Sequence, residues 1–171
     1  LKLGEEKLEV IDVPGTYTLE PTSEAEEIAL RMLETGDVVI NVVNATTMER
    51  SLYLTLQLLE KGTPVIVALN LWDDAKHRGI HIDLDRLREL LGVPVIPTVA
   101  VTGEGIKQLV DSIPNASSPD TRVRTRNDRW ASVAGIIEEV QRIEHRHHTW
   151  LERLQDASVK PLTGGMIALG V

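Results

Sequence analysis

Three short runs of apolar residues, many of them β-branched, constrain the fold of this sequence more than any other feature. The runs are residues 38–43 (VVINVV), 64–69 (PVIVAL) and 93–99 (VPVIPTV). Runs of this length and composition are typical of strands that are covered on both faces. Amphipathic helical segments alternate with them after short connections. This alternation predicts an α/β fold, with a mainly parallel sheet and helices on both faces.

Capping signals delimit the helices of this predicted fold. A polar N-cap residue precedes each apolar helical face, and a glycine after the helix allows the left-handed conformation that ends it. A further helix is predicted over residues 106–113, and Asp128 is predicted to cap a later one. The predicted pairs of N-cap and stop are Ser23 with Gly36, Thr46 with Gly62, and Asp83 with Gly92.

The chain divides into four predicted segments. Residues 1–114 form the α/β domain, which opens with a hairpin whose second strand leads into Asp12. Residues 115–127 begin with turn-forming residues and are predicted to be a linker. Apolar residues then recur at three- and four-residue steps, which predicts a helical segment over residues 128–158. Residues 159–171 end in an apolar stretch that is shorter than the roughly 20 residues of a membrane-spanning helix.

The composition excludes several classes of protein. The chain has 171 residues, of which 42% are hydrophobic, and this is enough for a sizeable buried core. Its net charge of -8 repels polyanions, so general nucleic-acid binding is not expected. It contains no cysteine, which excludes disulfides, thiolate metal sites and a cysteine nucleophile.

The first candidate site lies where the predicted hairpin ends, at residues 12–15 (DVPG). Ligands of α/β sheets bind at the carboxyl ends of strands, so an acid that leaves a strand is well placed to contact one. At this spacing in a nucleotide hydrolase, Asp12 holds Mg²⁺ and the amide of Gly15 approaches the terminal phosphate. The alternative is a strand followed by an ordinary Pro-Gly turn.

Two further loops follow predicted strands. Asp73 comes after the second apolar run, and an aspartate in the plane of guanine can accept from both the ring N1 hydrogen and the 2-amino group. Adenine lacks this pair of donors, so Asp73 would select guanine while Asn70 braces the neighbouring loops. In residues 98–105 (TVAVTGEG) a backbone amide can bond the guanine carbonyl. The alternative for residues 70–73 is a cluster of Asn and Asp at a helix start.

The order of the three loops along the chain favours one shared site over three unrelated turns. Residues 12–113 resemble the G domain of the ferrous iron transport protein B family. The resemblance rests on the stretches DVPGTYTLEPTSEAEEIA, NVVNATTMERSLYLTLQLLEKGTPVIVALNLWD and LGVPVIPTVAVTGEGI. It implies a P-loop GTPase fold of the Ras-like type, with residues 159–171 as the truncated start of a transmembrane region.

The resemblance also implies the site residues, ligands and partners. The implied ligands are GTP or GDP with Mg²⁺, and whether K⁺ assists hydrolysis stays open. The implied partners are the transporter's own membrane domain and Fe²⁺ as the transported ion, at the cytoplasmic face of the inner membrane. A homo-oligomer is compatible with this arrangement, and nucleic acid is not an expected partner. The implied catalytic residues are Gly15 and Thr16, and the implied ligand contacts are Asp12, which also holds the metal, Gly15, Asn70, Asp73 and Ala100.

The sequence departs from the family pattern in three places. It contains no Gly-x-x-x-x-Gly-Lys-Ser/Thr phosphate loop and no first-switch threonine. Both are expected upstream of Leu1, together with the first strand of the sheet, so the chain alone is expected to be inactive. Val99 stands where the family usually has serine. Thr16 is too short to orient a water molecule as a glutamine does, which predicts slow hydrolysis.

Other features leave alternatives open. His145, His147 and His148 suggest a metal site, although a solvated polar helix end is the favoured interpretation. One rival to the transporter domain is a soluble, ribosome-associated GTPase, which predicts a basic RNA-binding appendage. The other rival is a GTPase-like module that binds proteins without catalysis.

Overall fold

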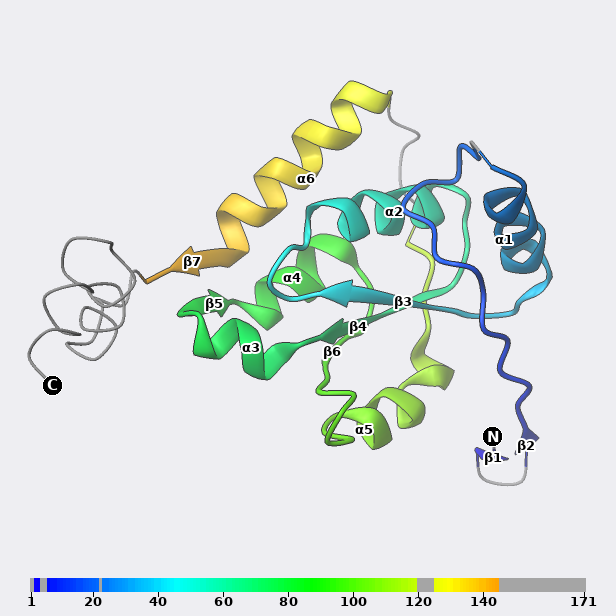
Figure 1. The fold of residues 1–171 in the computed structure, drawn as a ribbon, viewed down its shortest axis with the longest axis horizontal. Helices are drawn as coiled ribbons and strands as arrows, with labels where there is room; N and C mark the ends of the chain where they lie inside the picture. Colours follow the sequence, from blue (N-terminus) through cyan, green and yellow to red (C-terminus); the bar gives the residue numbers. More distant parts are fainter. Residues whose placement is uncertain (1, 4–5, 22, 120–124, 145–171) are drawn as a thin grey trace, which may run out of the picture.

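A parallel three-stranded sheet forms the centre of the computed structural model (Figure 1), which describes residues 2–3, 6–21, 23–119 and 125–144. Strand β4 lies in the middle, and its first five residues are buried. The last residues of β3 and β4 are paired with each other, and β6 pairs with β4 near the same end, so the strands share one carboxyl edge. The strands of this sheet are β3 (Val39–Asn44), β4 (Val65–Asn70) and β6 (Val95–Pro97).

Helices cover both faces of the sheet, which confirms the predicted α/β fold. Successive residues of β4 point alternately into two hydrophobic cores. The larger core lies under α2, α4 and α6, and in the smaller one Leu109 of α5 packs against Ile66, Ala68 and Ile96. The helices of the described residues are α1 (Glu24–Thr35), α2 (Glu49–Glu60), α3 (Trp72–His77), α4 (Leu84–Leu91), α5 (Ile106–Asp111), α6 (Arg126–Val140) and the short 3-10 helix η1 (Ile113–Asn115).

Several of the predicted caps are confirmed. The side chain of Ser23 accepts a hydrogen bond from the amide of Glu26 at 3.3 Å, which opens α1. The side chain of Asp83 opens α4 in the same way. Gly62 and Gly92 have φ angles of 77° and 67°, so each adopts the left-handed conformation expected after a helix.

Three cap predictions are wrong. The Thr46 hydroxyl donates to Asn44 Oδ1 at 2.9 Å, and α2 begins without a side-chain cap. Gly36 has a φ of -86°, so α1 ends in extended backbone. Thr125 caps α6, because its hydroxyl accepts from the amide of Asp128 at 3.2 Å and donates to the Asp128 carboxylate at 2.6 Å.

The N-terminal part of the chain differs from the prediction. Strands β1 (Lys2–Leu3) and β2 (Glu6–Lys7) pair with each other and with no other described strand, and their hairpin lies away from β3 in Figure 1. The predicted strand into Asp12 is therefore wrong, because a strand needs a partner edge and this segment has none among the described residues.

Strand β3 is covered on one face, whereas the sequence predicted cover on both. Asn41 and Val43 are buried, and the alternate residues Ile40 and Val42 are 39% and 60% exposed. The buried face packs against α2, where Asn41 Nδ2 donates to Thr55 Oγ1 at 2.7 Å. The described residues therefore cover the opposite face of β3 only in part.

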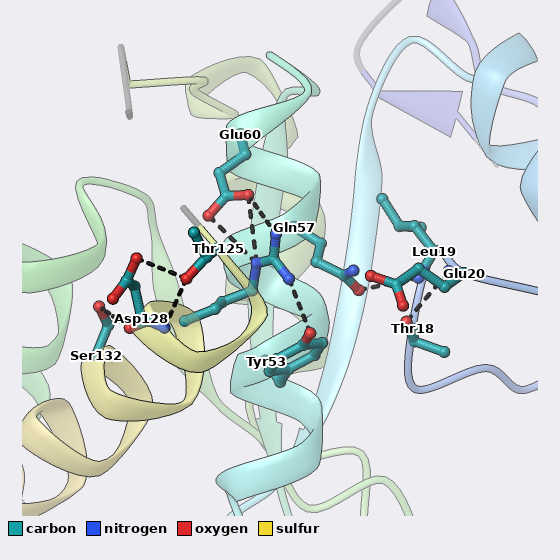
Figure 2. Close-up of polar contacts among 10 residues, drawn as sticks. Thr18, Leu19, Glu20, Tyr53, Gln57, Glu60, Thr125, Asp128 and Ser132 are labelled. Carbon is teal, nitrogen blue, oxygen red and sulfur yellow. Dashed lines mark hydrogen bonds and ion pairs between the residues drawn. The ribbon is translucent and has the colours of Figure 1, made fainter. Parts of the chain in front are cut away.

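Helix α6 is attached to the domain at several places. A buried ion pair holds it on α2, since Arg129 Nη2 lies 2.9 Å from Glu60 Oε2 and Arg129 Nη1 donates to the Tyr53 hydroxyl at 2.8 Å (Figure 2). An exposed ion pair joins Glu139 to Arg86 of α4. The hydrogen bond to the Glu60 carboxylate raises the pKa of Arg129 above its ordinary value, although burial opposes this shift.

A short antiparallel pair completes the attachment of α6. The chain leaves α6 at Val140 and forms β7 (Gln141–Ile143), which pairs with β5 (Ile80–Ile82). Within the predicted helical segment 128–158, the described residues thus form a helix and then a strand. Residues 145–171, which include the three histidines and the predicted start of a membrane region, lie outside the described residues. No helix in the described part of the chain combines the length and apolarity needed to cross a membrane.

Candidate functional site

The carboxyl ends of β4 and β6 bring two of the predicted loops together. Asn70 is the last residue of β4, and its Oδ1 accepts a hydrogen bond from the amide of Ala100 at 3.1 Å. The hydroxyl of the buried Thr98 lies 3.4 Å from the same oxygen. A single amide side chain therefore ties the loop after β6 to the end of β4.

The turn after Asn70 presents Asp73 beside this junction. Leu71 has a φ of 59°, which is uncommon for a residue other than glycine and is often found at functional sites. The amide of Trp72 donates to the Thr98 carbonyl at 3.3 Å, so this turn is also attached to the loop after β6. Asp73 follows in the first turn of α3 and is exposed. An exposed carboxylate on a braced turn is suited to accept hydrogen bonds from a ligand.

The loop after β6 is built on two glycines with left-handed backbone. Gly103 and Gly105 have φ angles of 80° and 78°. A methyl group on Gly105 would collide with the carbonyl of Pro97, whereas one on Gly103 would meet nothing within 4 Å. The amide of Val99 donates to the Glu104 carbonyl at 3.0 Å and closes the loop. This hydrogen bond and the close approach of Gly105 to Pro97 together keep Ala100 beside Asn70.

The Gly105→Ala variant is expected to lose about 2–3 kcal/mol of unfolding free energy, because it adds a steric collision to a strained φ. Gly103→Ala is the matched control and should lose about 1 kcal/mol, since only the strain applies. Urea denaturation monitored by tryptophan fluorescence measures both. Equal losses in the two variants would show that the contact with Pro97 carries no cost.

The segment that carries Asp12, Gly15 and Thr16 is held elsewhere, along α2. Asp12 and Gly15 are exposed, and Thr16 is half-buried. The Thr16 hydroxyl donates to the carbonyl of Thr18 at 2.7 Å and accepts from its amide at 3.3 Å. The next residue, Leu19, donates from its amide to Gln57 Oε1 of α2 at 2.9 Å (Figure 2).

The structure therefore brings together the residues predicted for the base side of the site, and it leaves the phosphate side apart. No described hydrogen bond or ion pair joins residues 12–16 to the Asn70 turn or to the loop after β6. In Figure 1 the blue segment between β2 and α1 lies in the right half of the view and the green helix α3 in the left half. Asp12 lies apart from the base side because it does not follow any strand of the main sheet, whose strands are β3, β4 and β6.

The sequence indicated no particular role for three residues at or near the site, although two of them lie in the predicted loops 70–73 and 98–105. Thr98 and Leu71 act through a hydroxyl contact and a backbone conformation, and neither has a distinctive sequence signal. Gln57 does have a distinctive sequence signal, because it is a polar residue between two leucines at the mainly apolar centre of its helix. A buried amide in such a place requires a hydrogen-bond partner.

The fit of the implied ligands differs between the two sides. The exposed Asp73 carboxylate on its braced turn fits a guanine base. Asp12 by itself is one acid for Mg²⁺, which in nucleotide hydrolases is also held by phosphate oxygens and a hydroxyl of the phosphate loop. The described residues contain no group of three or more acidic or histidine side chains placed to hold a metal.

Known proteins resemble this chain over most of its described length. Residues 1–113 match the family described as ferrous iron transport protein B. The Fe(2+) transporter FeoB of Escherichia coli is 50% identical over 106 residues, which make up 58% of this chain and 14% of the transporter. The chain spans 13–15% of the length of the curated relatives that it matches.

Two solved structures agree with this assignment. The cytosolic domain of L. pneumophila FeoB has a TM-score of 0.74 and 32% identity, over 83% of this chain and 82% of that one. The cytosolic domain of T. maritima FeoB in a GDP form has a TM-score of 0.59 and 40% identity, over 67% of this chain and 46% of that one. This chain therefore belongs to the ferrous iron transport protein B family, and its α/β domain is the G domain of that family.

Proposed function

We propose that this chain is the guanine-nucleotide-binding part of a ferrous iron transporter, in which GTP binding and hydrolysis regulate the passage of Fe²⁺. The observation that carries the proposal is the junction at the carboxyl edge of the sheet. There Asn70 braces the loop of Ala100, and Asp73 stands exposed on the adjoining turn. This arrangement supports a base pocket for guanine, because the carboxylate can accept from its N1 and 2-amino hydrogens together.

The reaction assigned by this proposal is transfer of the terminal phosphoryl group of GTP to water, with Mg²⁺ bound to the phosphates. Asp12 would hold the metal and the Gly15 amide would approach the terminal phosphate once a phosphate loop stands beside them. Thr16 replaces the longer side chain that orients water in many GTPases, so hydrolysis would be slow. Family membership and the GDP form of the T. maritima relative support the choice of nucleotide.

The proposed partners are the membrane domain of the same transporter and Fe²⁺ as its cargo, at the cytoplasmic face of the membrane. Ion pairs hold helix α6 to α2 and α4, and strand β7, which follows α6 directly, pairs with β5. Those attachments support a role for α6 in connecting the nucleotide domain to the part of the protein that follows.

The test is a comparison of GDP and ADP binding to the complete protein by isothermal titration calorimetry. GDP is expected to bind at least about 100-fold more tightly, because a site built to hydrogen-bond a donor pair rejects a base that lacks it. GTP hydrolysis measured by phosphate release should accompany binding. Equal affinities for GDP and ADP would contradict the assignment of Asp73 as the guanine-selecting residue.

A further inference from the structure

Gln57 is a polar residue at a place where the helix is otherwise closed off from solvent. Residues 51–59 of α2 are all buried, and Gln57 itself is 6% exposed. Burying an amide side chain is unfavourable unless it is hydrogen-bonded. Its partner is the backbone amide of Leu19, 38 positions away in the chain, which donates to Gln57 Oε1 at 2.9 Å.

A second contact holds the same segment on α2. The guanidinium carbon of Arg50 lies 5.8 Å from the centre of the Tyr17 ring, which is within the range of a cation–π interaction. Arg50 and Gln57 are about two turns apart on the helix, so they lie on one stripe of its surface. Tyr17 and Leu19 are thus attached to one stripe of α2 at two levels.

The segment between these contacts is also closed by its own hydrogen bonds. The Thr16 hydroxyl bonds both the carbonyl and the amide of Thr18. The hydroxyl of Thr18 in turn accepts from the amide of Glu20 at 3.1 Å (Figure 2). Residues 16–20 therefore form a compact turn, and an anchor at Leu19 restrains the whole turn, including Thr16.

We propose that Gln57 is a positioning residue for the nucleotide reaction, because its side-chain oxygen accepts from the Leu19 amide and so restrains the turn of Thr16 on α2. This inference rests on the proposed function, in which Gly15 and Thr16 face the terminal phosphate. Gln57 does not touch the nucleotide. Its effect passes through the backbone of residues 16–19, so it acts on turnover and leaves the base pocket at Asn70 and Asp73 unaltered.

Three variants of the complete protein separate this role from simple packing. Gln57→Met keeps the length of the side chain and removes the acceptor oxygen. Gln57→Glu retains an oxygen acceptor at the same position. Thr55→Val is the matched control, because it removes two buried hydrogen bonds of the same helix, one from Asn41 Nδ2 and one to the Ser51 carbonyl, and neither involves residues 16–20.

The first measurement is hydrogen–deuterium exchange of the peptide that contains Leu19, without nucleotide. Gln57→Met is expected to speed the exchange of this amide about tenfold, as the loss of one buried hydrogen bond predicts. Gln57→Glu should stay within about threefold of the parent protein, and Thr55→Val should leave the Leu19 amide unchanged. Unchanged exchange in Gln57→Met, or an equal acceleration in Thr55→Val, would overturn the anchoring role.

The second measurement is GTP turnover together with GDP affinity. Gln57→Met is expected to lower kcat about tenfold with the GDP dissociation constant unchanged, and Gln57→Glu should restore most of kcat. If the parent protein binds GDP and Gln57→Met keeps full kcat, the positioning role is wrong while the proposed function stands. If the parent protein binds no guanine nucleotide, the proposed function fails, and the positioning role for that reaction fails with it.

Discussion

Replacing Arg129 by methionine is expected to lower the free energy of unfolding by about 3 kcal/mol. Arg129 and Glu60 form an ion pair whose side chains are 9% and 6% exposed. Removing one partner of such a pair is costly, because the remaining charge stays in a place that water scarcely reaches. The variant also loses the hydrogen bond to Tyr53 and the guanidinium that lies 5.0 Å from the centre of its ring. Urea denaturation monitored by circular dichroism measures the loss.

Two comparisons test the physical reason for this loss. Arg86→Met breaks another ion pair that holds α6, but its side chains are 44% and 51% exposed, so solvent screens it and the loss should be far smaller. The double variant Arg129→Met with Glu60→Leu should recover most of the lost stability, because no buried charge of this pair remains. A double variant as unstable as Arg129→Met would show that the loss comes from packing and not from charge.

Asp73→Asn is expected to weaken GDP binding to the complete protein about 100-fold, or about 2.7 kcal/mol. The carboxylate can accept from both guanine donors, whereas an asparagine offers one acceptor and sets its own amino group against the 2-amino group of the base. A xanthine base carries an oxygen at that position, so the variant should bind xanthosine diphosphate better than the parent protein does. Calorimetric titration with both nucleotides measures this exchange of preference.

Asp74→Asn is the matched control for this variant. Asp74 is the next residue of α3, and its carboxylate lies 3.0 Å from Arg78 Nη2 on the same helix. This ion pair lies within α3 and is not part of the proposed base pocket. Its replacement should leave the affinities for GDP and xanthosine diphosphate unchanged. Equal losses in the two variants would indicate a general effect of charge on α3, and the specific role of Asp73 would be wrong.

The features that could be predicted from the sequence were those that depend on neighbouring residues. The strand β4 was expected within one residue of its bounds because its side chains are apolar without interruption. The cap at Asp83 and the stop at Gly92 were confirmed because capping involves groups only a few residues apart. Where two caps competed, as Thr125 and Asp128 do, the sequence pattern did not show which one would start the helix.

The candidate site also has one part that could be predicted from the sequence and one part that could not. The Asn70 turn and the loop of Ala100 each follow a buried strand, and parallel strands place such loops at one edge, so their meeting could be expected. Asp12 was expected at that edge on the assumption that a strand leads to it, and no described strand does. The spacing of Asp12 and Gly15 in the sequence carries no information on whether a partner strand is present.

By itself, the sequence determined the order of strands and helices, the parallel sheet and the set of polar residues that follow its strands, because these depend on local periodicity and on short connections. Only the tertiary structure decided that β7 pairs with β5, that Arg129 is buried against Glu60, and that Gln57 holds the Leu19 amide. Each of these joins residues far apart in the chain, and such contacts are selected by the burial and hydrogen-bonding of whole surfaces, which no local pattern encodes.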